Sequence, residues 1–322
     1  MPQPLPPPIL GIHHVTAIAS DPQRNLDFYA GVLGLRLVKR TVNFDDPSSY
    51  HFYFGDETGT PGTILTFFAW PGARRGAPGV GQVEAAAFRV PAASLGYWER
   101  RLRAAHVPVE PATPRFGETA LSFADPDGLR LELVAAPAAA AGAGRAWRPV
   151  PPEHALGGFH AVTLSEAAGA ATAGVLEAMG FGQTGEQHNR SRFALGAAGA
   201  AARLDVVAGG EARFGRIAAG IVHHVAWRVA DDAAQLAWRA RLLQLGLHVT
   251  PVLDRCYFHS IYFREPGGVL FEIATDPPGF TVDEPAARLG EALQLPPWLE
   301  PDRAQIESSL PPVAMPRPEP PA

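Results

Sequence analysis

The sequence predicts an α+β fold built from four βαβββ modules. A doubled histidine opens an apolar, β-branched segment twice, at His13-His14 and at His223-His224, 210 positions apart. Segments of this composition are typical of strands. Four stretches of the chain then follow the same order, with a strand, a helix and further strands. A unit that recurs in one local frame indicates duplication of a supersecondary element.

The first two modules occupy the N-terminal part of the chain. In the first we expect strands over residues 15–20, 50–55 and 63–70, a helix over 23–32 and a strand that ends at residue 38. The second begins near residue 83, with a helix over 94–105 and strands over 120–124 and 129–134. Gly34 after the first helix is a predicted C-cap, and Asp125-Pro126-Asp127-Gly128 is a predicted hairpin turn.

The last two modules repeat the same order. The third opens with a strand over 159–164, a helix that ends at Met179 and strands near 192–195 and 203–207. The fourth runs from His223 through a helix over 233–245 to strands over 260–264 and 269–274. Counting supports the alignment, because Ala85 lies 47 positions before Glu132 and His224 lies 48 positions before Glu272.

The repeat divides the chain into two halves and an extension. Modules one and two cover residues 9–134, a linker rich in Ala, Gly and Pro covers 135–155, and modules three and four cover 156–277. The remaining residues, 278–322, form a C-terminal extension in which we expect one short helix over 284–294. Its Pro-rich segments should wrap over the body, and the last dozen residues should be disordered.

Composition excludes several classes of protein. The 322 residues carry a net charge of -5, and no Lys/Arg-rich run indicates nucleic-acid binding. No run of strongly apolar residues is long enough to span a membrane. The N-terminus lacks the basic and apolar regions of a signal peptide, and Cys256 is the single cysteine. We therefore expect a cytoplasmic protein that binds neither nucleic acid nor membrane.

Strand-borne histidines and a glutamate predict a metal site. Two imidazoles and one carboxylate on one face form the triad that non-haem Fe(II) oxygenases use, because it leaves three coordination positions open. His224 and Glu272 lie on the first and last strands of module four, which line the same concave sheet. The third ligand must come from another module. His14 and His160 are the two candidates, because each occupies in its own module the position that His224 holds in module four.

Four stretches carry a resemblance to a known family: GIHHVTAIASDPQRNLDFYAGVLGLRLVKRTVNFDDPSSYHFYFGD, PGTILTFFAWPGA, GIVHHVAWRV and DRCYFHSIYFREPGGVLFEIATD. Over roughly residues 9–312 the chain resembles the vicinal oxygen chelate superfamily, which includes extradiol dioxygenases, glyoxalases and antibiotic-resistance proteins. Within it, the chain is most similar to the ring-cleaving hydroquinone 1,2-dioxygenase group. The resemblance implies that the four modules pair into two open β-barrel-like domains.

The resemblance also implies a set of site residues. It makes His14 the third metal ligand beside His224 and Glu272, and we prefer it to His160, which ordinary catechol enzymes would favour. It carries five more residues into the pocket: His13, His223, Thr16, Arg255 and Tyr262. Strict strand alternation would instead point His13 and His223 to the opposite face. A core tyrosine and a solvated arginine are the plain alternatives for Tyr262 and Arg255.

Other residues have weaker signals. Module two has Ala85 in the histidine position, so Glu132 lacks a partner and is expected to be surface-exposed, salt-bridged or vestigial. Four aromatic residues are candidates for an apolar wall around a ring: Phe67, Phe68, Trp70 and Phe258. The remaining histidines have no informative spacing, although His259 is close to the predicted site along the chain.

We therefore expect an Fe(II)-dependent dioxygenase, with Mn(II) as the alternative metal, that cleaves hydroquinone-type aromatic diols with O2. A catechol-type extradiol dioxygenase is one alternative. A glyoxalase-like lyase or isomerase is another, but it needs a fourth protein ligand, and the corresponding place near Thr66-Phe67 offers no carboxylate. A metal-free protein that sequesters aromatic compounds has no use for the His-His-Glu set. The oligomeric state stays open, with a homo-oligomer among the alternatives.

Overall fold

The computed structural model describes residues 6–136, 150–196, 202–209 and 213–316 of the chain. The named strands of these residues form two eight-stranded sheets, and each sheet combines two modules. The predicted α+β fold of paired βαβββ modules is confirmed.

The first sheet contains modules one and four. Module one comprises β1 (Gly11–Ala19), α1 (Pro22–Leu26), β2 (Arg36–Asn43), β3 (Asp46–Gly55) and β4 (Ile64–Ala69). Module four comprises β13 (Val222–Val229), α5 (Asp232–Gln244), β14 (Leu253–Asp254), β15 (Phe258–Arg264) and β16 (Leu270–Pro278). Antiparallel β1 and β13 lie at the middle of the sheet, and each has a parallel neighbour, β4 and β16 respectively.

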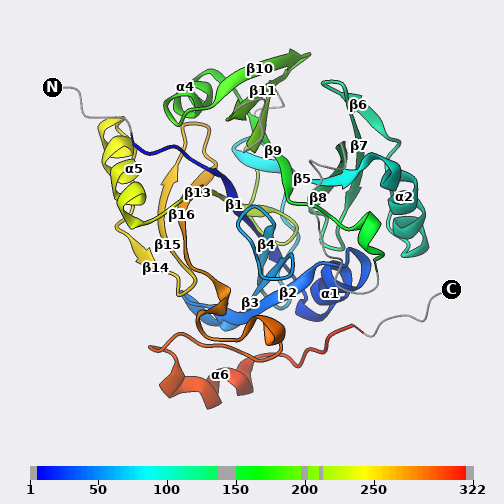
Figure 1. Ribbon diagram of the computed structural model, residues 1–322, viewed down its shortest axis with the longest axis vertical. Coiled ribbons are helices and arrows are strands. Elements are labelled where there is room, and N and C mark those ends of the chain that lie inside the picture. Colours follow the sequence, from blue (N-terminus) through cyan, green and yellow to red (C-terminus); the bar gives the residue numbers. More distant parts are fainter. Residues whose placement is uncertain (1–5, 137–149, 197–201, 210–212, 317–322) are drawn as a thin grey trace.

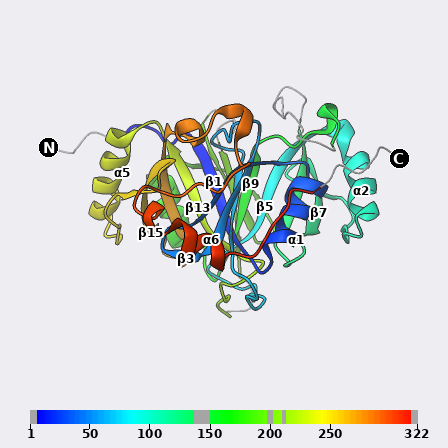
Figure 2. The ribbon, with the colours of Figure 1, turned by 90° about the horizontal axis from the view of Figure 1, so that it is seen from below.

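The second sheet contains modules two and three. Module two comprises β5 (Gln82–Pro91), α2 (Leu95–Ala104), β6 (Thr113–Arg115), β7 (Glu118–Ala124) and β8 (Arg130–Ala136). Module three comprises β9 (Phe159–Glu166), α4 (Ala170–Ala178), β10 (Gly182–Gln187), β11 (Arg190–Leu195) and β12 (Ala202–Ala208). In Figure 1 the two curled sheets stand side by side, and Figure 2 shows α5 and α2 at opposite ends of the molecule.

The pairing of modules crosses the two halves of the sequence. Each sheet takes one module from residues 9–134 and one from residues 156–277, so neither half forms a sheet of its own. Most of the expected linker, residues 137–149, lies outside the described residues. A single large cluster of buried apolar side chains includes members of both sheets, such as Val15 and Phe67 from the first and Phe88 and Leu164 from the second.

Helix ends follow from local chemistry. The side chains of Asp21 and Asp231 accept hydrogen bonds from the backbone N–H of Arg24 and Ala234, which caps α1 and α5. Helix α1 is shorter than predicted, because residues Asp27–Val32 continue as a π-helix. Gly34 after it adopts φ +69°, a left-handed conformation that suits glycine.

The C-terminal extension differs from its prediction. Residues 284–294 form no α-helix: only Ala286–Arg288 make a 3₁₀ turn, and Gly290 with φ +77° interrupts any helix. The chain then runs beside β2, where the Gln294 N–H donates to the Arg40 carbonyl at 2.9 Å. An α-helix, α6 (Arg303–Ser309), follows and passes beneath β3 in Figure 1.

Ion pairs and hydrogen bonds attach this extension to the body. The fully buried ammonium group of Lys39 on β2 contacts the carboxylates of Asp283 and Glu284. We expected residues 311–322 to be disordered, but the Tyr50 hydroxyl donates to the Pro311 carbonyl at 3.1 Å, and the Ala314 N–H donates to Gln23 at 2.8 Å. Residues 317–322 lie outside the described part.

No helix in the described residues is long and apolar enough to cross a membrane. The cytoplasmic location stays a prediction.

Candidate metal centre

Three buried side chains converge at the middle of the first sheet. The Nε2 atoms of His14 on β1 and His224 on β13 lie 3.2 Å apart. Oε2 of Glu272 on β16 lies 3.3 Å from the His14 Nε2 and 2.9 Å from the His224 Nε2. Among the described residues, these three form the one group with the composition and spacing of a metal site. All three were predicted as ligands, and the structure brings them together.

Strand register explains the convergence. On the antiparallel strands β1 and β13, Thr16 lies opposite His224 and His14 lies opposite Ala226. Ala226 is in turn the neighbour of Glu272 on the parallel strand β16. Positions related in this way lie on one face of a sheet, so residues 14, 224 and 272 all face inward. The Glu position of module one is held by Thr66, the neighbour of Thr16 on β4, which is no carboxylate.

The geometry fits a divalent metal. Ligand atoms about 2.1 Å from a shared ion and at right angles to one another are about 3 Å apart. The three observed separations are close to that value. Oε2 of Glu272 is buried and faces the Nε2 atoms of His14 and His224, whereas Oε1 accepts a hydrogen bond of 2.5 Å from the Ser260 hydroxyl. One carboxylate oxygen is thus held by the protein, and the other is left for an ion.

Electrostatics favour the charge states that a metal needs. Burial alone would raise the pKa of Glu272, but the adjacent imidazoles of His14 and His224 hold it well below the usual value. Burial lowers the pKa of His224, in spite of the nearby carboxylate. An ionised Glu272 and a neutral His224 are the states in which these side chains bind a metal.

His13 and His223 each contact the ligand that follows them. The Nδ1 atoms of His13 and His14 are 2.9 Å apart, and those of His223 and His224 are 2.8 Å apart. The register of β1 with β13 shifts between Ile12 and His14 and again between Thr16 and Ala17, and these shifts leave His13 and His223 without a cross-strand partner. A β-bulge of this kind re-aims a side chain, which is why simple alternation does not apply.

These contacts orient the ligand rings. When Nε2 of His14 or His224 offers its lone pair to a metal, Nδ1 carries the proton and donates it to the preceding histidine. Such an outer partner fixes the tautomer of a ligand and the orientation of its ring. Burial lowers the pKa of His13, and burial with the adjacent His224 lowers the pKa of His223 to about 3. Both side chains are therefore neutral acceptors at neutral pH.

Tyr262 and Arg255 lie together at one side of the site. Tyr262 on β15 is opposite Glu272 on β16, and its ring centroid lies 5.6 Å from that of His224. The Arg255 Nε donates to the Tyr262 hydroxyl at 3.3 Å, and its terminal nitrogens reach Asp45 at 3.1 and 3.3 Å. Burial raises the pKa of the Tyr262 phenol, so this hydroxyl keeps its proton at neutral pH.

A chain of hydroxyl groups leads to a histidine that sequence reasoning missed. The Thr66 hydroxyl donates to Thr16 at 2.9 Å, and the His51 Nε2 lies 2.8 Å from the same Thr66 oxygen. Burial lowers the pKa of His51, with smaller contributions from His14 and His224. The sequence has no signal for this contact, because it depends on strand register: residue 51 lies opposite residue 68 on β4, two positions beyond Thr66.

We call the small cavity beside the three ligands the inner cavity. It has about 30 Å³ of free space. Its lining comprises His14, Thr16, Asn43, Phe44, Asp45, His51, Tyr53, Phe68, His224, Arg255, Phe258 and Tyr262. Of the predicted aromatic wall, Phe68 and Phe258 line it. Trp70 stacks on Phe68, whereas Phe67 packs against Tyr29 in the core.

His160, the alternative third ligand, belongs to the second sheet. Its Nε2 lies 3.0 Å from Glu118. Ala161 lies opposite Ala87, the neighbour of Glu132, just as His14 lies opposite Ala226, the neighbour of Glu272. His160 therefore corresponds to His13, and the frame expected from the sequence is shifted by one residue.

An ion-pair network takes the place of a metal site in the second sheet. Glu132 is buried and forms a salt bridge of 2.7 Å with Arg115. Of the three expected states of Glu132, the structure shows the salt bridge. Arg192 contacts Glu118 at 2.5 Å and Asp205 at 2.8 Å. Within the described residues of this sheet, charge pairs are present, and His14, His224 and Glu272 of the first sheet remain the one group with the spacing of a metal site.

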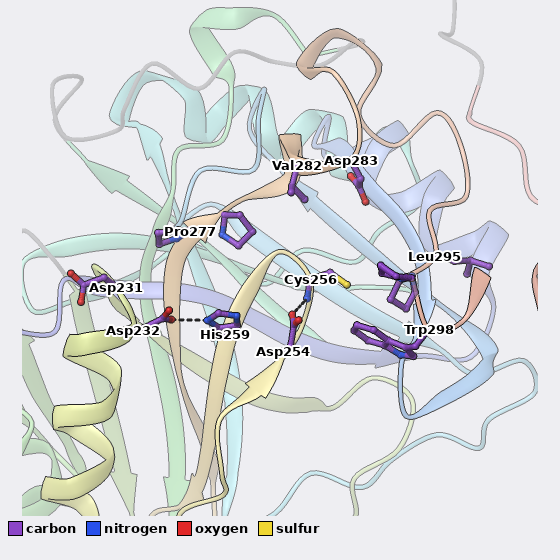
Figure 3. Close-up of a pocket in the computed structure, with 13 residues that line it drawn as sticks. Asp231, Asp232, Asp254, Cys256, His259, Pro277, Val282, Asp283, Leu295 and Trp298 are labelled. Carbon is purple, nitrogen blue, oxygen red and sulfur yellow. Dashed lines mark hydrogen bonds and ion pairs between the residues drawn. The ribbon is translucent and has the colours of Figure 1, made fainter. Parts of the chain in front are cut away.

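A larger cavity, which we call the outer cavity, lies beside the first sheet (Figure 3). It has about 670 Å³ of free space. Its wall includes Asp254 at the end of β14, Cys256 in the loop before β15, and Trp298 from the C-terminal extension. It also includes His259, which contacts Asp232 at 2.6 Å. His259 is thus directed to this cavity and not to the metal ligands.

Comparison with known proteins agrees with this fold. The family described as Glyoxalase/Bleomycin resistance protein/Dioxygenase superfamily matches residues 11–133. The chain is 48% identical to "Putative ring-cleaving dioxygenase MhqO" of Bacillus subtilis (strain 168), over 94% of this chain and 96% of that relative. It is 37% identical to the chlorohydroquinone/hydroquinone 1,2-dioxygenase of Sphingobium indicum, over 92% of this chain and 94% of that enzyme.

Solved structures of other proteins have the same fold. The crystal structure of a "putative dioxygenase" from Bacillus subtilis superposes with a TM-score of 0.90 and 46% identity, covering 96% of this chain and 98% of that one. Glyoxalase I from Zea mays superposes with a TM-score of 0.60 at 15% identity, covering 83% of this chain and 92% of that one, which shows the fold alone. The chain belongs to the glyoxalase/bleomycin resistance protein/dioxygenase superfamily.

Proposed function

We propose that the protein is an Fe(II)-dependent dioxygenase that cleaves hydroquinone-type aromatic rings with O2. The observation that supports this most directly is the set of three buried ligands, His14, His224 and Glu272, beside a cavity with aromatic walls. Relatives named as ring-cleaving dioxygenases, one of them a hydroquinone 1,2-dioxygenase, support the reaction class. Mn(II) is the alternative metal for the same ligands.

The ligand set favours a dioxygenase over a glyoxalase-like lyase. When bound, Fe(II) supplies Lewis acidity and one-electron redox chemistry at open coordination positions. A fourth protein carboxylate would occupy one of those positions. Thr66 stands at the corresponding place in module one, and its hydroxyl hydrogen-bonds to Thr16. The coordination positions on the side of the inner cavity are thus left for the substrate.

The surrounding side chains have distinct proposed tasks. His13 and His223 hold the ligand imidazoles in one tautomer through their Nδ1 contacts. Tyr262 keeps its phenolic proton and can donate it to a developing oxyanion, and Arg255 supplies a fixed positive charge beside it. Thr16 faces the inner cavity as a hydroxyl that can orient the ring.

The position of Arg255 suits a para-diol. The two oxygens of a hydroquinone lie on opposite sides of the ring, so only one can bind the metal and the other must be held by protein. Arg255 lines the inner cavity and is anchored by Asp45, whose side chain is 72% exposed. We assign Arg255 to the distant oxygen.

The test is to load the purified protein anaerobically with Fe(II) and to follow O2 uptake with hydroquinones and catechols. We expect kcat/KM to be higher for hydroquinones. A tenfold preference for catechols, about 1.4 kcal/mol in transition-state binding, would make the protein an ordinary extradiol dioxygenase. Absence of O2 uptake with every diol would reject the proposed function.

A further inference from the structure

A row of four side chains crosses the middle of the first sheet, on the strands β13, β1, β4 and β3. His224 on β13 lies opposite Thr16 on β1, and Thr16 is the neighbour of Thr66 on β4. His51 on β3 completes the row, because its Nε2 lies 2.8 Å from the Thr66 hydroxyl oxygen. The row thus begins at a predicted metal ligand and ends at a histidine outside the ligand set.

The number of protons gives the hydrogen bonds of this row a direction. The Thr66 hydroxyl has one proton, which it donates to Thr16 at 2.9 Å. Thr66 must therefore accept in its contact with His51, so Nε2 of His51 carries a proton. Burial holds the pKa of His51 well below its usual value, so the ring is neutral at neutral pH and has this proton alone. The hydrogen bonds run from His51 to Thr66 and from Thr66 to Thr16.

The last proton of the row is that of Thr16 itself. Thr16 is 1% exposed, and its side chain lines the inner cavity. Its hydroxyl accepts from Thr66, and within the described residues no acceptor lies at hydrogen-bonding distance for its own proton. A buried donor without a partner is destabilising. This proton is therefore available to an oxygen of a ligand in the inner cavity.

The His51 ring is held in place by aromatic packing. Its centroid lies 4.1 Å from that of Tyr53 and 4.4 Å from that of Phe68. A hydroxyl rotates to suit its partners, whereas a ring that is packed in this way keeps its Nε2–H on the Thr66 oxygen. His51 is thus the rigid end of the row, and it sets the direction of the two hydroxyl groups.

We propose that His51 is a positioning residue, which acts through Thr66 to point the Thr16 hydroxyl proton at an ionised ring oxygen of the substrate. This inference rests on the proposed function, because it places a diol oxygen at the ligand end of the inner cavity. Thr16 lies opposite the ligand His224, whereas Arg255 is assigned to the distant oxygen. A hydrogen bond to the ionised form favours that form, so the row lowers the pKa of the bound phenol.

The test uses variants that each remove one hydrogen-bonding group. His51→Leu removes the first donor, whereas His51→Gln keeps an N–H donor. Thr66→Val interrupts the row, and Thr16→Val removes the last donor. Thr41→Val is the matched control for T66V, because Thr41 lies opposite His51 on β2 and its buried hydroxyl has no partner among the described residues.

The readout is the pKa of para-nitrophenol bound to the protein after loading with Fe(II) in the absence of O2. This ligand has a single hydroxyl, and its ionised form absorbs visible light. We expect T16V, T66V and H51L to raise this pKa by about one unit, a tenfold change in ionisation. H51Q should raise it less, and T41V should not change it. An unchanged pKa in H51L and T66V, or an equal rise in H51L and H51Q, would overturn the proposal.

A double variant tests whether His51 acts through Thr16. If it does, the pKa of bound nitrophenol in T16V/H51L equals that in T16V alone, because His51 then has no hydroxyl to orient. Such non-additivity is expected of residues in one hydrogen-bond network. A further rise in the double variant would also overturn the proposal, since His51 would then act on the ligand without Thr16.

The nitrophenol titration needs no turnover, so it separates this inference from the proposed function. If the wild type cleaves no diol but H51L and T66V shift the titration, the proposed function fails and the positioning role stands. If the wild type cleaves hydroquinone but both variants titrate as it does, the positioning role is overturned and the proposed function stands. With both correct, kcat/KM for hydroquinone should fall about tenfold in H51L and T66V, and T41V should match the wild type.

Discussion

The Nε2 atoms of His14 and His224 lie 3.2 Å apart, although 210 residues separate these histidines in the chain. The contact exists because β1 and β13 pair antiparallel at the centre of the first sheet. Neither module alone holds the complete ligand set, since module four supplies His224 and Glu272 and module one supplies His14. The candidate metal centre therefore forms where module one pairs with module four.

Tyr262→Phe tests the proton-transfer role of the phenol. The ring should keep its packing against His224, and the variant should keep its iron, because only the hydroxyl is lost. We expect kcat to fall about 10²–10⁴-fold, as for loss of a general acid. The measurement is single-turnover O2 consumption together with metal analysis. Wild-type kcat in this variant would leave Tyr262 as a packing residue.

His223→Ala tests the second contact of the ligand His224. The variant loses the acceptor for the Nδ1–H of His224 but no metal ligand. We expect iron to be retained, with about a 10–100-fold loss in metal affinity or activity, which is typical for outer partners of ligands. His223→Gln restores a hydrogen-bonding side chain and should recover part of the loss. Equal values for both variants and the wild type would contradict the orienting role.

Arg255→Ala tests how the distant hydroxyl is held. We expect KM for hydroquinone to rise more than KM for any catechol, because a catechol can place both oxygens on the metal. Asp45→Asn is the companion variant, since it weakens the anchor of Arg255 and keeps the cation. It should give a smaller change in the same direction. A uniform rise in KM for all diols would show that Arg255 does not distinguish them.

The four modules could be predicted from the sequence because each repeats the same order of strand, helix and further strands. The pairing of module one with module four could not be derived from the residues, because it depends on contacts between distant strands and entered only through the family resemblance. His13 and His223 show a second limit. Regular strand alternation predicts that these two side chains point away from the metal ligands. They point toward the ligands because the pairing of β1 with β13 shifts register at both positions.

His51 and the C-terminal extension show why other features were missed. His51 has no informative spacing in the chain, and its contact with Thr66 depends on the register of β3 with β4. In the extension, helical propensity over 284–294 is outweighed by Gly290 and by pairing with β2, where Leu293 and Arg40 form a bridge. Both cases are tertiary effects on a weak local signal.

A buried carboxyl group predicts pH-dependent stability. Glu166 at the end of β9 is 1% exposed, and burial together with Glu265 on the β15–β16 turn raises its pKa to about 8. Between its unfolded pKa of 4.5 and this value the folded state binds more protons than the unfolded state. The free energy of unfolding should therefore fall as pH rises from about 5 to about 8.

Glu166→Gln removes that titration. We expect the unfolding free energy of the variant to fall less over this pH range, with a difference from the wild type on the order of 1–4 kcal/mol. Glu177→Gln on the exposed face of α4 is the control and should follow the wild type. Denaturant unfolding at several pH values measures the effect. Parallel curves for all three proteins would show that Glu166 does not govern this dependence.

The most direct test of the candidate metal centre is the iron content of two single variants. His14 lies beside His224 and Glu272, whereas His160 contacts Glu118 in the second sheet. After identical anaerobic loading and gel filtration, we expect His160→Ala to retain one iron per chain, as the wild type does, and His14→Ala to lose it. Loss of iron from His160→Ala with retention in His14→Ala would contradict the account.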